Sequence, residues 1–216
     1  MTAAIGAEAP RDCPLCPRLV AFRAANRSAE PTWYNGAVAS FGPASARLLV
    51  VGLAPGLKGA NRTGRPFTGD FAGELLYSAL LQFGFARGSY QARPDDGLML
   101  VDCMITNAVR CVPPQNKPTP AESRACQPFL ARRIATMPEL AAIVALGRIA
   151  HDSTLAALEA RKAAFQFAHG ARHALGERLV LFDSFHCSRY NTNTGKLTPA
   201  MFHAVLAAVR RHLDPP

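Results

Sequence analysis

Four short apolar runs, each bounded by Gly, Pro, Asp or Asn, alternate along the chain with longer amphipathic stretches. The runs cover residues 47–53 (RLLVVGL), 99–105 (MLVDCMI), 141–146 (AAIVAL) and 178–182 (RLVLF). Their length and β-branched content are typical of buried strands. The amphipathic stretches have apolar residues at helical spacing, which predicts helices over 71–83, 120–136, 148–158 and 199–213.

Two of the predicted helices have clear starts. Thr119 and Pro120 supply a capping hydroxyl and a first-turn proline, Glu122 completes a capping box, and Thr198 with Pro199 repeats the cap and proline. The alternation of strands and helices predicts an α/β fold: a single three-layer α/β/α domain with a central, mainly parallel four-stranded sheet. In such a sheet, ligands bind in loops at the carboxyl ends of the strands.

Composition supports one globular domain spanning residues 1–216. The chain is 49% hydrophobic and 18% charged, which excludes a disordered, collagenous or coiled-coil protein. Its 24 Lys and Arg against 15 Asp and Glu give a net charge of +9, so nucleic acid or an anionic membrane surface is a candidate partner. The longest apolar run, 140–147, is too short to span a membrane, and Glu8 interrupts any signal-peptide pattern. We therefore expect no membrane insertion and a cytoplasmic location.

The six cysteines include four with ligand-like spacing. Cys13 and Cys16 form a C-x2-C pair in the N-terminal segment 1–46, and Cys111 and Cys126 form a wider pair. Four thiolates suit either tetrahedral zinc or an iron-sulfur cluster, and the spacing alone leaves zinc, iron-sulfur and no metal open. Cys103 lies in an apolar run and is expected in the core. Cys187 adjoins His186, which suggests a nucleophile only weakly, because adjacent loop residues seldom point at each other.

Two loops that follow predicted strands carry ligand-binding residue types. Residues 52–59 (GLAPGLKG) place glycines where backbone must approach a ligand, but the motif is neither a P-loop nor a dinucleotide fingerprint. Its continuation, 61–70 (NRTGRPFTGD), adds two arginines, an aromatic residue and a carboxylate. Residues 184–196 are dense in hydrogen-bond donors, and a solvated connector with Asx turns is the alternative interpretation.

Three stretches resemble the signature motifs of the uracil-DNA glycosylase superfamily: GLAPGLKGANRTGRPFTGD, NAVRCVPPQNKPTP and SFHCSRYNTNTGKLT. The similarity is greatest to the iron-sulfur type B branch called family 5, and it extends from Cys13 to the C-terminal helix. The resemblance implies a 4Fe-4S cluster, because related family 4 and family 5 enzymes hold one with cysteines matching Cys13, Cys16, Cys111 and Cys126.

The resemblance also implies roles for the loop residues. Phe67 would stack on a flipped uracil, backbone near Ala54, Pro55 and Gly56 would line the site, and His186 would donate a hydrogen bond to a uracil carbonyl oxygen. Position 54 carries Asp, Asn or Glu in most branches of the superfamily but is alanine here, as in family 5. Asp70 is the nearest candidate to replace that carboxylate, and a helix N-cap is its alternative role.

Asn107 departs from the family 5 pattern. Family 4 enzymes have asparagine here, in an I-T-N stretch that contacts the uracil edge, and an amide can pair bidentately with that edge. Asn116 is a second, weaker candidate for a base contact. The remaining candidates are residues expected to contact DNA phosphates or to enter the base stack: Arg62, Arg65, Ser188, Arg189, Tyr190 and Lys196.

These motifs predict a monofunctional, monomeric DNA glycosylase that hydrolyses the bond between uracil and deoxyribose and leaves an abasic site for base excision repair. No lysine has an evident pocket position, so no lyase step is expected. Other deaminated or modified bases are expected substrates as well. The missing carboxylate at Ala54 motivates the alternative, a catalytically silent iron-sulfur protein that binds nucleic acid.

Overall fold

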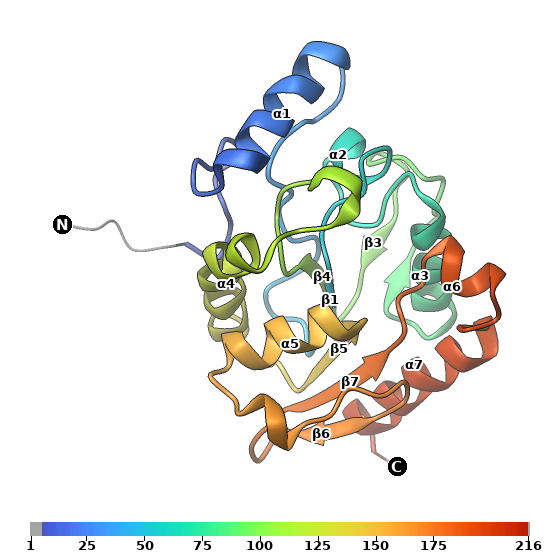
Figure 1. The fold of residues 1–216 in the computed structure, drawn as a ribbon. Helices are drawn as coiled ribbons and strands as arrows, with labels where there is room; N and C mark the ends of the chain where they lie inside the picture. The colour runs from blue at the N-terminus through green and yellow to red at the C-terminus, as the bar shows by residue number, and fades with distance from the viewer. Residues whose placement is uncertain (1–5, 216) are drawn as a thin grey trace.

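The computed structural model describes residues 6–215, which are built around a five-stranded sheet (Figure 1). Four strands are parallel and the fifth, an edge strand, runs antiparallel to its neighbour. In spatial order they are β4 (Cys103–Asn107), β1 (Leu48–Gly52), β5 (Ala142–Leu146), β7 (Val180–Ser184) and β6 (Arg172–Ala174). The α/β class and the mainly parallel sheet are confirmed. The prediction of four strands was wrong, because β6 is too short and polar to be recognised from its sequence.

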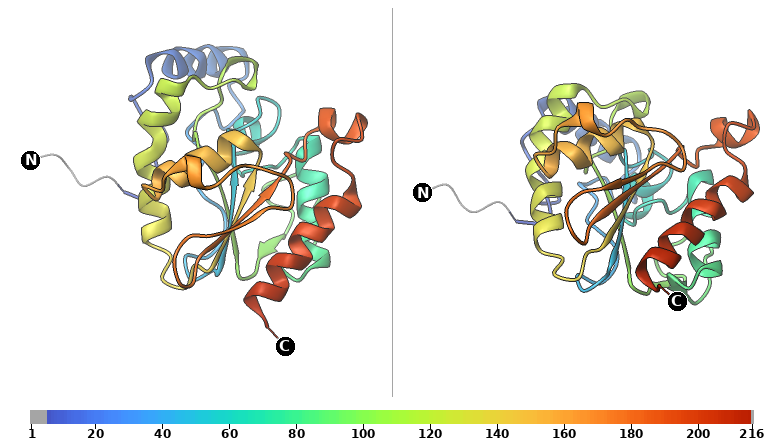
Figure 2. Two further views of the ribbon diagram at one scale, coloured as in Figure 1. Left: turned by 60° about the horizontal axis from the view of Figure 1, so that its bottom comes forward. Right: turned by 90° about the horizontal axis from the view of Figure 1, so that it is seen from below.

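Helices cover both faces of the sheet (Figure 2). On one face, α3 (Phe71–Gln82) and α7 (Pro199–Leu213) share an apolar core with Leu48 and Val50. On the other, α4 (Pro120–Ala135) and α5 (Arg148–Ala157) belong to the core that contains Leu49 and Val51. The alternating side chains of β1 thus face two separate cores, as expected for a strand buried on both sides.

All four predicted helices are present, with the predicted starts and with ends within one residue of prediction. Thr119 forms the capping box with Glu122, and the side chain of Thr198 caps α7. No helix within residues 6–215 is long and apolar enough to cross a membrane.

Several further elements were not predicted. They are α1 (Pro17–Ala29), α2 (Ala60–Thr63), α6 (Arg189–Asn193), the 3-10 turns η1 (Pro114–Asn116) and η2 (Lys162–Ala164), and strand β2 (Ala86–Arg87), which forms a hairpin with β3 (Met99–Leu100). Helix α1 lies beside the start of α4 (Figure 1), and Arg18 joins the two by donating to Glu122 at 2.8 Å. The N-terminal segment is therefore attached to the helix that carries Cys126.

The second predicted strand, 99–105, is divided at Asp102. This residue adopts a left-handed conformation (φ 53°), and its carboxylate accepts hydrogen bonds from the backbone and the guanidinium of Arg47, each at 2.8 Å. Residues before it form β3 of the separate hairpin, and residues after it form β4. The apolar run therefore contains two strands of different sheets rather than one.

The sheet topology places three loops at one edge. From β1 the chain continues to its neighbour β4 and then returns to the opposite side of β1 as β5, so the order of strands reverses beside β1. Such a reversal opens a crevice at the carboxyl ends of the strands. Gly52, the last residue of β1, is in register with Asn107, the last residue of β4, and β7 ends nearby at Ser184.

A buried ion pair holds the loop that follows α2. The guanidinium of Arg65 donates to both carboxylate oxygens of Asp96 at 2.8 Å, and its side chain is only 6% exposed. Asp96 also accepts from the backbone N–H groups of Gln91 and Leu98 at 2.9 and 3.1 Å. The assignment of Arg65 to DNA phosphates is therefore corrected, because its guanidinium is already paired inside the protein.

We expect Asp96→Ala to lower the free energy of unfolding by about 3 kcal/mol or more, since removing one partner leaves the Arg65 charge buried and unpaired. The matched control is Asp95→Ala, whose exposed carboxylate lies 3.8 Å from Arg93 and is expected to cost less than about 1 kcal/mol. Urea denaturation measures both. Equal effects of the two substitutions would contradict the structural role of the buried pair.

Candidate active site

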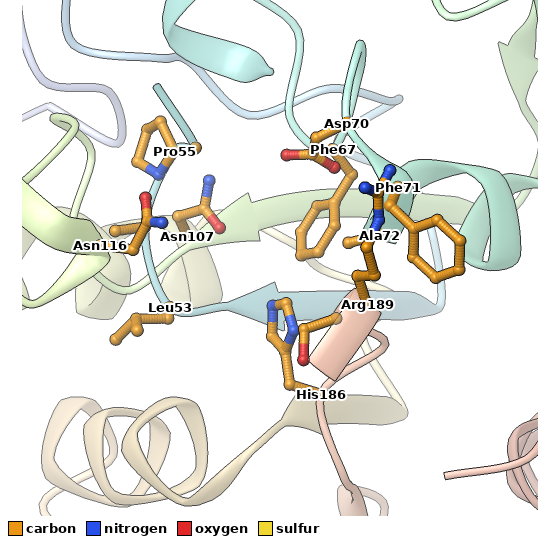
Figure 3. Close-up of a pocket in the computed structure, with 13 residues that line it drawn as sticks. Leu53, Pro55, Phe67, Asp70, Phe71, Ala72, Asn107, Asn116, His186 and Arg189 are labelled. Atoms are coloured by element: carbon orange, nitrogen blue, oxygen red, sulfur yellow. The ribbon is translucent and has the colours of Figure 1, made fainter. Parts of the chain in front are cut away.

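A cavity of about 370 Å³ lies at the carboxyl edge of the sheet, where the loops after β1, β4 and β7 meet. It brings together most of the residues predicted from the motifs. Leu53, Phe71 and Ala72 also line it and were missed, although each lies within two positions of a predicted residue. The complete lining is Leu53, Ala54, Pro55, Gly56, Phe67, Asp70, Phe71, Ala72, Asn107, Asn116, His186, Ser188 and Arg189 (Figure 3).

Asn107 is held at the floor of the site by the pairing of β1 with β4. Its side chain lies against Gly52: a Cβ at that glycine would fall 2.5 Å from Phe67 Cζ and closer still to Asn107 Oδ1. Asn107 is 2% exposed, and its Oδ1 has no hydrogen-bond partner among residues 6–215. A buried polar atom without a partner is rare in folded proteins and is explained when a ligand supplies the partner.

Phe67 is held in a left-handed conformation (φ 53°), which is unusual for an aromatic residue. Its carbonyl accepts a hydrogen bond from the Tyr90 hydroxyl at 3.2 Å, and the preceding carbonyl, of Pro66, accepts one from Tyr77 at 2.6 Å. The ring packs on the apolar core and also lines the cavity, with its centre 5.9 Å from that of the His186 ring. Phe67 is therefore a core residue and a cavity residue at once.

Asp70 has its two carboxylate oxygens in different settings. Oδ1 accepts from the backbone N–H of Gly73 at 3.3 Å and caps α3. Oδ2 faces the first motif loop: a Cβ at Gly56 would lie 2.8 Å from it, and one at Gly59 would be closer. Burial raises the pKa of Asp70, while hydrogen bonds from the backbone of Gly73 and Ala72 oppose that shift. One oxygen is thus engaged in capping and the other is available at the cavity.

His186 enters the cavity from the segment after β7, two residues beyond the strand end (Figure 3). Asn191 Nδ2 donates to the His186 carbonyl at 2.8 Å, and so fixes the backbone of this residue. Burial lowers the pKa of the imidazole to about 4. At neutral pH the ring is therefore uncharged, and it can donate a hydrogen bond without carrying a full positive charge.

Polar and cationic residues lie around the cavity. Arg62, Arg189 and Lys196 are exposed, Tyr190 is 74% exposed, and Asn116 is exposed on the loop after β4. Ser188 accepts from the Asn191 backbone and caps α6, which presents Arg189 and Tyr190. The guanidinium of Arg189 lies 5.2 Å from the centre of the Phe71 ring. These side chains are placed where a polyanion could reach them.

The four spaced cysteines are far apart in the sequence but lie together in the structure. Cys13 precedes α1, Cys16 is its N-cap, Cys111 follows β4 and Cys126 lies within α4, and all four line one small hollow. The Arg23 guanidinium donates to Cys111 Sγ at 3.6 Å, and the Arg110 backbone donates to Cys126 Sγ at 3.3 Å. Burial raises the pKa of Cys111 to about 12 and that of Cys126 to about 11.

The donor set of this hollow bears on the kind of metal it would hold. Four cysteine sulfurs meet there, and no His, Asp or Glu is among the described residues that line it. Four thiolates suit a tetrahedral zinc ion or an iron-sulfur cluster, so the residues present fit either centre.

The other two cysteines lie in the apolar core. Cys103 and Cys187 are both fully buried in the cluster that includes Leu76 and Phe202. Burial raises the pKa of Cys187 to about 12. Cys187 therefore anchors the segment that carries His186 in the apolar core. Its thiol lacks the low pKa that a nucleophilic cysteine needs.

One polar cluster was not predicted. His151 Nδ1 lies 2.7 Å from Asp183 Oδ1, and His173 Nε2 lies 3.0 Å from Asp183 Oδ2. The other ring nitrogen of His151 lies 3.0 Å from the Phe165 carbonyl. The three side chains come from α5, β6 and β7, so only the fold brings them together.

A cavity that offers an aromatic face, an unpaired amide and a neutral imidazole, beside exposed cations, defines a pocket for a planar heterocycle at the edge of an α/β sheet. Comparison with known proteins gives the family. Residues 39–210 match the family model described as uracil DNA glycosylase superfamily. The chain therefore belongs to this superfamily, and its relatives place it with the type-5 members.

Two relatives named type-5 uracil-DNA glycosylase match most of the chain. The protein of Thermus thermophilus is 46% identical over 205 residues, covering 92% of this chain and 93% of its own. The protein of Pyrobaculum aerophilum is 39% identical, covering 90% and 86%. A type-4 uracil-DNA glycosylase of Pyrobaculum aerophilum matches only 53% of this chain, at 37% identity.

We expect His186 to remain neutral as pH falls from 7 to about 5 and to take up a proton only near pH 4, because burial makes its charged form costly. Histidine NMR shifts followed through an acid titration measure this, and His186→Gln assigns the signal by removing it. A signal assigned to His186 that titrates at pH 6 or above would contradict the neutral imidazole.

Proposed function

We propose that this protein is a DNA glycosylase that hydrolyses the N-glycosidic bond of uracil in DNA and leaves an abasic site for base excision repair. The main support is the buried amide of Asn107, whose Oδ1 has no partner among residues 6–215 and which lies in the same cavity as Phe67 and His186. The type-5 uracil-DNA glycosylases that this chain resembles are named for the same activity.

Base recognition requires that the nucleotide leave the stack, because the reacting atoms are hidden inside the duplex. In our proposal the flipped uracil stacks on Phe67, whose strained backbone keeps the ring at the cavity. The Asn107 amide accepts from uracil N3–H and donates to a neighbouring carbonyl oxygen, which satisfies its unpaired oxygen. The backbone of residues 54–56 lines the rest of the base, and Asn116 adds an outer contact.

The chemical step separates charge. As the glycosidic bond breaks, the base gains negative charge and the sugar becomes a positive oxocarbenium ion. His186 donates a hydrogen bond to a uracil carbonyl oxygen and stabilises the departing base, and its neutral form lets it do so without protonating the base outright.

Water must then attack the sugar, and Asp70 is our candidate to orient it. Ala54 offers no carboxylate, whereas Asp70 Oδ2 faces Gly56 at the cavity. The raised pKa of Asp70 makes it a stronger base than an exposed aspartate. Its charge also faces the developing oxocarbenium ion.

DNA contacts in this proposal come from the exposed side chains around the cavity. Arg62, Arg189 and Lys196 approach phosphates, while Ser188 and Tyr190, at the start of α6, lie where a wedge would enter the base stack. We propose a monofunctional enzyme, since no lysine lines the cavity in the described part of the chain. We further propose a broad range of deaminated bases, a monomeric state and a cytoplasmic location.

We also propose that Cys13, Cys16, Cys111 and Cys126 hold a 4Fe-4S cluster. Their meeting in one hollow and the hydrogen bonds to the sulfurs of Cys111 and Cys126 support it. When bound, the cluster would supply a structural cross-link between the start of α1, the loop after β4 and α4. The four cysteines that would hold it lie in a hollow apart from the base cavity, and no cysteine lines that cavity in the described chain.

The proposed activity is tested with a labelled duplex that contains one uracil opposite guanine, treated with alkali after incubation. We expect strand cleavage by the wild type and a rate at least about 100-fold lower for Asp70→Asn, because general-base residues typically contribute that much. Asparagine caps helices as well as aspartate does, so this variant removes the carboxylate and keeps the cap of α3.

Asp95→Asn, at an exposed site, is the matched control and should cleave like the wild type. No cleavage by excess wild-type protein would refute the enzyme and favour the silent nucleic-acid-binding alternative. Wild-type activity of Asp70→Asn would limit Asp70 to its capping role. The same assay with hypoxanthine, xanthine and ethenocytosine, in single and double strands, measures the range of bases.

For the cluster, we expect purified protein to be brown, with broad visible absorption and about four irons per chain. Cys111→Ser should lose both the colour and the iron, because one of four ligands is gone. Cys103→Ala is the matched control: it removes a buried cysteine in the core and should keep the colour. Colourless wild-type protein with one zinc per chain would refute the cluster.

A further inference from the structure

His169 touches the segment that carries His186, although no motif includes it. Its Nδ1 accepts a hydrogen bond from the backbone N–H of Phe185 at 3.1 Å. Its ring stacks on the Phe185 ring, with centres 5.1 Å apart and planes 20° from parallel. Phe185 immediately precedes His186, so both contacts act on the residue next to the imidazole in the cavity.

We propose that His169 is a positioning residue: by accepting from Phe185 N–H it fixes the peptide ahead of His186 and aims the His186 imidazole at the base. The inference rests on the proposed function and adds a residue to it. His169 does not line the base cavity; it lies in a neighbouring hollow that shares His186 with it.

The backbone at His186 needs such support because it lies beyond the sheet. β7 ends at Ser184, whose carbonyl still accepts from Gly147 N–H at 2.8 Å. Past that point two side chains hold the chain: His169 binds the N–H of Phe185, and Asn191 binds the carbonyl of His186 at 2.8 Å. The two residues are therefore clamped from both sides by hydrogen bonds rather than by a strand neighbour.

The direction of the hydrogen bond defines the state of His169. A backbone N–H only donates, so Nδ1 must be unprotonated and the ring proton must lie on Nε2. Burial lowers the pKa of His169, whereas a hydrogen bond with the backbone of Met201 opposes that shift. The other charged or titratable groups lining the same hollow are Arg148, His186 and Lys196.

The loop that carries His169 is itself anchored to α5 and β7. His151 Nε2 donates to the Phe165 carbonyl at 3.0 Å, because a carbonyl can only accept. Asp183 accepts from Ala168 N–H at 3.4 Å, and the Asp183 carbonyl accepts from Gly170 N–H at 2.8 Å. His169 thus lies between two backbone contacts to a residue three positions before His186, which explains how its ring is held in place.

Two substitutions separate the hydrogen bond from the ring packing. His169→Phe keeps an aromatic ring against Phe185 but removes the acceptor, and His169→Asn keeps an acceptor oxygen near the position of Nδ1. For His169→Phe we expect the single-turnover rate of uracil excision to fall about tenfold or more, since misplacing a catalytic group by about 1 Å costs up to 100-fold. Affinity for the DNA should change less than about twofold, because no phosphate contact is removed. His169→Asn should retain most of the rate.

Hydrogen exchange at the Phe185 amide measures the contact independently of activity. It should accelerate in His169→Phe and remain slow in His169→Asn. The matched control is His203→Phe. His203 is a half-buried histidine of α7 that packs edge-on against Phe83, and its replacement should change neither readout.

Wild-type excision and wild-type exchange in His169→Phe would overturn the inference, as would equal impairment of both His169 variants, which would assign the effect to ring packing. A wild-type protein without excision would refute the proposed function and this role together. Normal excision by the wild type and His169→Phe alike would refute this role alone.

Discussion

The site depends on how closely the ends of two parallel strands approach each other. Gly52 ends β1 in register with Asn107, which ends β4, and the space that a side chain at Gly52 would occupy is taken by the Asn107 amide and the Phe67 ring. Hydrogen bonding between the strands therefore fixes how deep in the cavity the Asn107 amide lies. The absence of a side chain at Gly52 lets the Phe67 ring approach the strand end closely. A larger residue at position 52 would displace the Asn107 amide and the Phe67 ring together. The pairing of the strands and the shape of the cavity therefore cannot vary independently.

The loops around that point are held by polar contacts, several of them buried. Phe67 adopts an unfavourable backbone conformation, and the loop that carries it is fixed by the Arg65–Asp96 ion pair and by the Tyr90 hydroxyl. Strained residues persist where the surrounding structure overdetermines them, and such places are often functional. On the opposite side, the segment of His186 is clamped by side chains instead of strand neighbours. The Phe67 and His186 rings therefore both depend on support from outside the cavity.

Much of the fold was predictable because the chain is locally consistent. The helices at 71–82 and 120–135 begin with caps that can be identified in the sequence, and β1 and β5 are short, continuous apolar runs. The failures have physical causes. The run 99–105 is interrupted by the left-handed turn at Asp102, and strand β6 is too short and polar to show a pattern. Arg65 lies in a motif among residues that face the cavity, but its partner Asp96 comes from a distant loop whose position no local pattern reveals.

The sequence by itself determined the class of fold, the family and the residues that meet at the carboxyl edge, because strands, caps and motifs are local patterns that survive without knowledge of their neighbours. Only the tertiary structure decided what each of those side chains does. It divided the oxygens of Asp70 between a cap and the cavity, left Asn107 Oδ1 without a partner, and buried Cys187 in the core. It also placed His169 behind His186. Burial, pairing and pKa are properties of the surroundings of a side chain, and those surroundings come from segments far apart in the chain.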